Sequence, residues 1–257
     1  MSYSKSVRKT QNRSKKAVHN QDGFFDENAV NFGHRQWQSP PDFKSLTSNH
    51  IRVIKTIQIA PITIVSGPAG SLKTFLALQS GLRSLKENQF DQYLYVRQNI
   101  QRPNEKSFGS LPGDETAKLD PLLAPIRDNL NALVPPGELK YLIEKNRIKG
   151  SDIDMIRGRS PLSTFIHCDE AQNCDLNALQ AVMTRLPSSS KMVITGDFLG
   201  QKDIDDPAFD AFEYVCKEFS NHPRIKVITL TKNDILRNDL IIDILEGFDN
   251  IKRKMKR

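Results

Sequence analysis

Residues 62–74 of the chain read ITIVSGPAGSLKT. A run of β-branched and apolar residues, which predicts a strand, is followed by a glycine-bearing loop and then by Lys73 and Thr74, which open a helical pattern. A phosphate-binding loop needs this order, because the backbone N–H groups of such a loop and of the first helical turn point at the phosphates. Lys73 would supply a mobile positive charge and the Thr74 hydroxyl would bind Mg²⁺. Taken alone, the same residues fit an ordinary strand-to-helix turn.

The loop departs from the full phosphate-binding pattern at Leu72, where a glycine normally precedes the lysine. Glycine adopts a left-handed backbone freely, whereas another L-residue there costs roughly 1–2 kcal/mol. If Leu72 strains the loop, Leu72→Gly is expected to tighten the binding of the phosphate ligand.

The composition indicates a soluble globular protein, with 38% hydrophobic and 26% charged residues in a chain of 257. No apolar run is long enough to cross a bilayer, and the basic N-terminus lacks the apolar segment of a secretory signal. The three cysteines have no metal-site spacing and indicate a reducing compartment. We therefore expect a cytoplasmic protein that does not bind a membrane.

The positive charge is concentrated in two tails. Residues 1–20 contain six Lys and Arg and no acid, and residues 252–257 contain five and no acid. Removing these eleven charges from the net +7 leaves −4 on the rest of the chain. Such tails can bind nucleic-acid phosphates, or they can be solvated ends that aid solubility, and the sequence favours neither reading.

The expected domain organisation is a disordered basic tail over residues 1–22, one domain over 23–250 and a basic tail over 251–257. Prolines and glycines recur at about 98–160 and indicate an insertion of irregular and helical structure, in which no strand is recognised. Strands are predicted at 62–65, 92–96, 164–168, 191–195 and 225–230. Helices are predicted at 46–57, 75–85, 119–133, 138–146, 175–186, 207–219 and 234–248.

The pattern at the first of these helices predicts Thr47 or Ser48 as its N-cap and one buried face formed by Ile51, Ile54 and Ile57.

Alternating strands and helices predict an α/β fold, in which helices cover both faces of a parallel sheet. The phosphate-loop candidate after the first strand suggests that this fold is a RecA-like P-loop NTPase core. In such sheets the ligand lies at the carboxyl ends of the strands. Three predicted strands end in polar residues there: the first in the 67–74 loop, the third in Asp169-Glu170 and the fourth in Gly196-Asp197.

These residue types suit phosphoanhydride hydrolysis. Asp169 at a strand end can hold Mg²⁺ through its water shell, and Glu170 can act as general base for the attacking water. Gln172 and Asp197 can contact the γ-phosphate or that water. An acidic pair at a strand end is also common on protein surfaces, but its position after a phosphate-loop candidate favours the functional reading.

The ordered motifs resemble those of the PhoH family of P-loop ATPases, whose nucleotide core is related to superfamily-one helicases. The similarity covers roughly residues 45–250. GPAGSLKT at 67–74 resembles the family's Walker A motif, FIHCDEAQN at 165–173 its Walker B motif and KMVITGD at 191–197 its sensor strand. FGSLPGD at 108–114, IRGRS at 156–160 and LTKNDILR at 230–237 are similar to further family segments.

The resemblance implies ATP and Mg²⁺ as cofactors. It implies that Gly67, Pro68, Ala69, Gly70, Ser71, Leu72, Lys73, Thr74, Gln172 and Asp197 bind nucleotide, that Thr74 and Asp169 hold the metal, and that Glu170, Lys73 and Arg237 are catalytic. RNA or single-stranded DNA is the expected partner because of the basic tails. The chain is similar to the compact members of the family found in bacteriophages, which would place it in the host cytoplasm.

Two departures from the family pattern change what we expect. The sensor motif is one residue longer, so that Gln201 is displaced from the site, and Asn49-His50 stands where an adenine-reading glutamine is common.

One core of this kind fits in the chain, so strand separation would require a homo-oligomer in which Arg237 completes a neighbour's site. The alternative is a nucleotide-loaded binding or switch protein with little hydrolysis. A small-molecule kinase is a weaker reading, because no lid is evident.

Overall fold

Six parallel strands form the sheet of the protein in a computed structural model, which describes residues 46–98, 122–156, 158–197, 210–236, 238 and 240–255. The strands are β1 (Ile62–Ser66), β2 (Gln92–Arg97), β3 (Ile148–Asp152), β4 (Thr164–Asp169), β5 (Lys191–Gly196) and β6 (Ile225–Thr229). Their order across the sheet is β3-β2-β4-β5-β1-β6, and every neighbouring pair is parallel. This order confirms the predicted α/β class with a RecA-like P-loop core.

The central strands are buried on both faces, which explains why they read as continuous apolar runs. Every residue of β1 and of β4 is buried. Parallel strands are covered by helices on both sides, so that alternate residues do not face water. β1 pairs with β5 on one side, with Ile64 opposite Ile194, and with β6 on the other.

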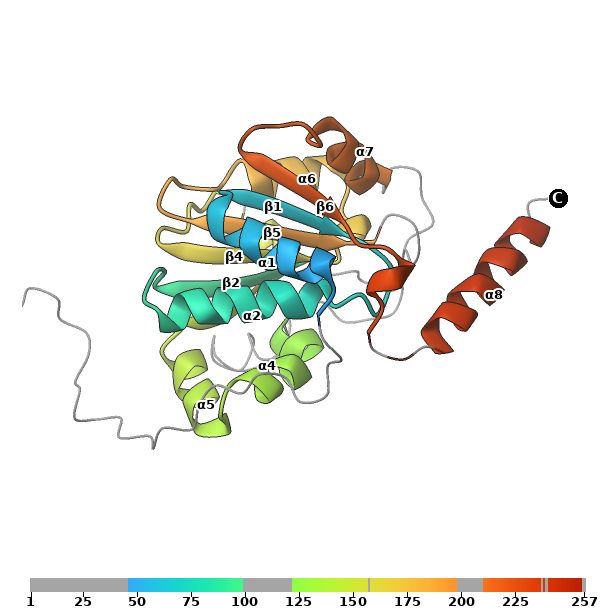
Figure 1. The fold of residues 1–257 in the computed structure, drawn as a ribbon. Helices are drawn as coiled ribbons and strands as arrows, with labels where there is room; N and C mark the ends of the chain where they lie inside the picture. The colour runs from blue at the N-terminus through green and yellow to red at the C-terminus, as the bar shows by residue number, and fades with distance from the viewer. Residues whose placement is uncertain are drawn as a thin grey trace, which may run out of the picture. The chain divides into compact units, whose positions relative to one another are not determined.

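Helices pack against the sheet (Figure 1), and the buried apolar side chains form two hydrophobic clusters. The first packs α1 (Ser48–Ile59), α2 (Lys73–Lys86), α4 (Arg127–Leu133) and α5 (Pro136–Glu144) with the sheet. The second includes residues of α6 (Leu176–Met183), of α7 (Ala211–Glu218) and of η3 (Ile153–Ile156). The remaining described elements are the short turns η2 (Ala124–Ile126), η4 (Ala171–Asn173) and η6 (Lys232–Asp234), and the helix α8 (Leu240–Met255).

The strand β3 was not predicted, and its residues explain why. It reads IKGSD, with a single large apolar residue, and glycine and aspartate are poor strand formers. Its backbone is held by parallel pairing with β2, in which Ile148 lies opposite Tyr93. The predicted absence of a strand between residues 98 and 160 is therefore wrong, and the sheet has six strands instead of five.

The first helix is capped as predicted by Thr47, whose hydroxyl oxygen accepts a hydrogen bond from the N–H of His50. Its buried face differs from the prediction: His50, Val53 and Ile57 are buried, whereas 44% of Ile51 is exposed. The imidazole of His50 makes the difference, because its Nδ1 accepts from the N–H of Thr47 and its Nε2 lies 3.2 Å from the carbonyl oxygen of Ser71. Hydrogen bonding thus buries a polar residue where hydrophobicity alone favoured an isoleucine.

The closing helix begins later than predicted. The pattern placed it at 234–248, but residues 232–234 form the turn η6 and α8 runs from Leu240 to Met255. Asp234 ends the earlier turn because its carboxylate accepts hydrogen bonds from the N–H of Thr231, the hydroxyl of Thr47 and the amide of Asn49. These bonds lower the pKa of Asp234 and tie η6 to the start of α1.

The loop between β1 and α2 carries the local strain that the sequence suggests. Leu72 has φ 64° and ψ 14°, in the left-handed region, directly before α2 begins. Its side chain is half-buried against the first hydrophobic cluster. Leu72 therefore packs against the core while its backbone has a conformation that glycine would adopt without strain.

We predict that Leu72→Gly is more stable to urea than Leu72→Ala by about 1 kcal/mol. Both variants lose the leucine packing, but only glycine relieves the left-handed strain. At the exposed α2 position Arg83 the order reverses, because alanine favours a right-handed helix over glycine. Equal or greater stability of Leu72→Ala would show that residue 72 is not held left-handed. Because the strain is already present in the free fold, the tighter nucleotide binding expected above for Leu72→Gly follows only if binding alters this backbone.

Candidate nucleotide-binding site

The loop after β1 folds tightly on itself. A Cβ at Gly67 would lie 2.7 Å from the Cβ of Leu230, so no side chain fits there. Gly70 has φ 82°, a conformation that side chains rarely adopt. The Ser71 hydroxyl donates to the carbonyl oxygen of Pro68 at 2.7 Å and closes the loop. The glycines are thus needed for the close approach and for the turn.

Lys73 begins α2, and its ammonium group bends back over the loop. Its Nζ donates to the carbonyl oxygens of Gly67 at 2.6 Å and Pro68 at 2.9 Å. Burial lowers the pKa of Lys73, while the carboxylates of Asp197, Glu170 and Asp169 act in the opposite direction. A positive charge therefore lies in the loop and within the field of three acids.

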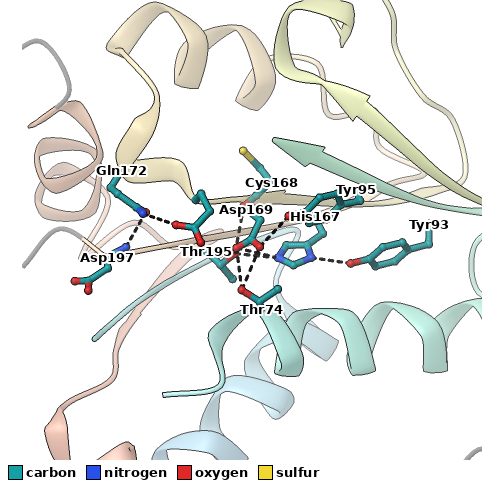
Figure 2. A network of polar contacts seen from close by, with 10 residues as sticks. Thr74, Tyr93, Tyr95, His167, Cys168, Asp169, Gln172, Thr195 and Asp197 are labelled. Carbon is teal, nitrogen blue, oxygen red and sulfur yellow. Dashed lines mark hydrogen bonds and ion pairs between the residues drawn. The ribbon is translucent and has the colours of Figure 1, made fainter. Parts of the chain in front are cut away.

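Thr74 and Asp169 meet across the site, as Figure 2 shows. The Thr74 hydroxyl lies 3.0 and 3.1 Å from the two carboxylate oxygens of Asp169, although the residues are 95 positions apart in the sequence. Asp169 is the last residue of β4 and is 4% exposed. It also accepts hydrogen bonds from the hydroxyls of Thr195 at 2.5 Å and Tyr95 at 3.1 Å.

Glu170 follows directly and has φ 54°, which turns the chain sharply after β4. Burial raises the pKa of Glu170, and the charge of Asp169 raises it further, while Gln172, Arg97 and Lys73 oppose the shift. The Gln172 amide donates to the carboxylate of Glu170. Glu170 is therefore a carboxylate that takes up a proton more readily than an exposed one, at the edge of the site.

Gln172 also connects this turn to the end of β5. Its side-chain oxygen accepts a hydrogen bond from the N–H of Asp197 at 2.9 Å (Figure 2). At Gly196 a Cβ would lie 2.6 Å from the ring of Phe212 and 3.0 Å from that same oxygen, so glycine leaves the room that Gln172 occupies. Gln172 thus makes its contacts with Glu170 and with the β5 end.

The structure brings most of the predicted site residues together and leaves one of them, Arg237, outside its description. The 67–74 loop, Asp169, Glu170, Gln172 and Asp197 all lie at or just beyond the carboxyl ends of β1, β4 and β5. Gln201, which was expected to be displaced from the site, also lies outside the described residues. Arg97, the last residue of β2, is close enough to oppose the rise in the pKa of Glu170.

Several residues at the site were not predicted. Tyr95 and Thr195 contact Asp169 directly, and His167 lies behind them at 0% exposure. Burial lowers the pKa of His167, although the nearby charge of Asp169 acts in the opposite direction. The lowered pKa favours the neutral imidazole. The available sequence signal was polar residues inside otherwise apolar strands, but such residues occur in many cores for packing reasons alone.

The donor set of the site fits Mg²⁺. Magnesium prefers oxygen ligands and is commonly held by one or two carboxylates together with substrate phosphates and water. The carboxylate of Asp169 and the hydroxyl of Thr74 are such ligands and are adjacent. Within the described ranges no group of three or more His, Cys, Asp and Glu could hold a metal by itself.

Comparisons with known proteins agree with the motifs. A family model described as "PhoH-like protein" matches residues 42–249. A PhoH-like protein of Synechocystis is 31% identical over 206 residues, covering 80% of this chain and 62% of that protein. A PhoH-like protein of Bacillus subtilis is 31% identical over 183 residues, covering 71% of this chain and 56% of that protein. The chain thus spans about three fifths of the length of these relatives.

Among solved structures, the SWI2/SNF2 ATPase core of Sulfolobus solfataricus in complex with double-stranded DNA is similar at 16% identity and a TM-score of 0.42, covering 82% of this chain and 49% of that chain. A similarity this distant carries no conclusion on function.

In the described part of the chain, no helix combines the length and the apolar character that a membrane span requires. Because the family model matches most of the sequence, this protein belongs to the PhoH-like protein family.

Proposed function

We propose that the protein is an ATP-binding, Mg²⁺-dependent nucleoside triphosphatase. The contact between the Thr74 hydroxyl and the Asp169 carboxylate, with Lys73 and Glu170 beside it, is the observation that carries the proposal. Membership of the PhoH-like family supports nucleotide binding, and ATP hydrolysis is the reaction that this set of residues suits.

Each residue has a distinct role in the proposed reaction. The backbone of the 67–74 loop and Lys73 hold the phosphates, while Thr74 and Asp169 hold the metal. When bound, Mg²⁺ neutralises charge that develops on the transferring phosphoryl group. Glu170 accepts a proton from the attacking water as the new P–O bond forms and the bond to the ADP oxygen breaks, and Gln172 orients the Glu170 carboxylate.

We predict that Glu170→Gln lowers steady-state ATP hydrolysis by about 10²–10⁴-fold while ATP still binds. The amide is nearly the same size but cannot accept the proton from water. The matched control is Glu218→Gln on the exposed end of α7, which is expected to hydrolyse ATP at the wild-type rate. Undiminished turnover in Glu170→Gln would contradict the assigned base. Tight ATP binding by the wild type without turnover would instead favour the nucleotide-loaded switch.

The basic tails support a nucleic-acid partner, RNA or single-stranded DNA. Six Lys and Arg without an acid in residues 1–20 give this segment a strong positive charge, whereas residues 21–251 carry −4. Phosphate binding releases counterions, so such contacts weaken as salt rises. Steady-state ATP turnover against a panel of RNA and DNA strands would identify the strand that this protein uses.

We predict that a Lys15→Gln and Lys16→Gln double variant flattens the dependence of log K on log salt for a single strand by about 1.4, because each lost phosphate contact removes about 0.7. Fluorescence anisotropy with labelled RNA and DNA oligonucleotides measures this slope. The control exchanges two exposed lysines, Lys140 on α5 and Lys145 directly after it, for glutamine, which removes the same charge from the body. An equal slope change in both variants would remove the tail from the proposal.

Self-assembly into a ring, with Arg237 completing the site of a neighbouring copy, is the remaining part of the proposal. Arg237 lies outside the described residues, and its role rests on its place in the 230–237 motif.

Phage origin likewise remains a prediction from the sequence, because the relatives named above are bacterial. The tail boundaries at 22 and 251 and the extent of the insertion at about 98–160 also remain proposals.

We predict that mixing inactive Arg237→Ala with inactive Glu170→Gln restores part of the ATPase activity. A site formed by the intact Glu170 of one copy and the intact Arg237 of the other would then be complete. The control mixes Arg237→Ala with a double variant that carries both substitutions and cannot complete any site. No recovery in the first mixture would rule out a finger supplied in trans.

A further inference from the structure

A line of buried polar side chains runs behind Asp169, and none of the roles proposed above uses it. Its members are Tyr93 on β2, His167 on β4 and Thr195 on β5, each 0% exposed (Figure 2). They lie inside strands that are otherwise apolar. Polar groups in such a place destabilise a protein unless every one is hydrogen-bonded, so their arrangement needs a reason.

The three side chains form one continuous hydrogen-bonded chain that ends on the Asp169 carboxylate. The Tyr93 hydroxyl lies 2.6 Å from Nδ1 of His167, and Nε2 of His167 lies 2.9 Å from the Thr195 hydroxyl. The Thr195 hydroxyl lies 2.5 Å from Oδ1 of Asp169. The imidazole itself is 3.9 Å from that oxygen, so it reaches the carboxylate through Thr195.

The direction of the chain follows from its last contact. An ionised carboxylate only accepts, so Thr195 donates its single proton to Asp169; the other acceptor, the carbonyl oxygen of Cys168, is 3.5 Å away. Thr195 must then accept from His167, which puts the proton of the neutral imidazole on Nε2. Nδ1 is left as an acceptor for the Tyr93 hydroxyl, which keeps its proton because burial raises the pKa of Tyr93.

Packing holds the far end of the chain in place. The Tyr93 ring stacks on Phe165, with centroids 5.8 Å apart and planes 15° from parallel. On α2, a Cβ at Gly81 would lie 2.5 Å from the Tyr93 ring and 2.7 Å from the Phe165 ring, so a glycine in the middle of this helix leaves the room that both rings fill. Glycine inside a helix is unfavourable, and its presence here fits a need for the tyrosine.

We propose that Tyr93, His167 and Thr195 are positioning residues that fix the orientation of the Asp169 carboxylate and thereby set the affinity of the site for Mg²⁺. The inference rests on the proposed function, in which Asp169 holds the metal. Thr195 fixes Oδ1 and Tyr95 fixes Oδ2, each through a hydroxyl. Because all of these donors are neutral, they orient the carboxylate while leaving its negative charge available to a cation.

The decisive measurement is the binding of ADP by calorimetry, in EDTA and at increasing Mg²⁺ concentration. Removing outer partners of a metal ligand typically weakens metal binding 10–100-fold. We expect His167→Leu to raise the Mg²⁺ concentration for half-maximal enhancement of ADP binding about tenfold. Tyr93→Phe, which removes one hydroxyl and keeps the ring, should shift it less. ADP binding in EDTA should stay unchanged in both.

Two further variants separate orientation from general loss of packing. His167→Gln retains an N–H donor for Thr195 and should recover part of the Mg²⁺ response. Ile148→Val lies opposite Tyr93 on β3, trims the same core and leaves the hydrogen-bonded chain intact, so its Mg²⁺ response should equal that of the wild type. If Tyr93→Phe and His167→Leu respond to Mg²⁺ as Ile148→Val does, the inference is overturned.

A readout without nucleotide or metal tests the direction of the chain. With ¹⁵N-labelled histidine, NMR should show His167 of the wild type as the neutral tautomer with its proton on Nε2. A neutral ring with its proton on Nδ1 would contradict the proposed order of donors. A wild type whose ADP binding ignores Mg²⁺ would overturn the metal role of Asp169 in the proposed function. A normal wild-type response, together with His167→Leu and Tyr93→Phe variants that respond to Mg²⁺ like the wild type, would overturn only the positioning role.

Discussion

Parallel pairing of β4 with β5 and of β5 with β1 is the constraint on which every contact of the site depends. It places Val65 opposite Thr195 and Cys168 opposite Ile194, so that the three strands end at the same edge of the sheet. The loop after β1, the acidic pair after β4 and the Gly196-Asp197 end of β5 therefore meet without any long side chain having to reach across. A shift of one strand by a single residue would turn its polar end away from the others.

The site concentrates negative charge and satisfies it mostly with neutral donors. Asp169 and Asp197 are nearly fully buried, and Glu170 is buried enough for its pKa to rise. Three hydroxyls, those of Thr74, Thr195 and Tyr95, contact Asp169. A hydroxyl removes the penalty of an unbonded buried oxygen without cancelling the charge, whereas an arginine in the same place would form an ion pair and compete with a divalent cation. The arrangement therefore suits a carboxylate that serves a metal.

Two residues with a strained backbone lie at the same edge. Leu72 and Glu170 both have a left-handed backbone, one directly before the phosphate-loop lysine and the other directly after the β4 aspartate. Such conformations persist where the surrounding structure holds them, and they are common at functional sites. Here the sharp turns aim the side chains that follow the strands, and the energy that they require is offset by the packing of the parallel sheet and its helices.

Local sequence determined the phosphate loop, the acidic pair, five of the six strands and the α/β class, because glycine spacing, strand-end polarity and hydrophobic periodicity act over a few residues. Only the tertiary structure decided that IKGSD at 148–152 is a strand, that His50 is buried, and that Tyr95, Thr195 and the His167 chain converge on Asp169. Each of these depends on partners from distant segments. Hydrogen bonds and pairing between such segments exist only after the chain has folded, and therefore leave no periodic signal in the sequence.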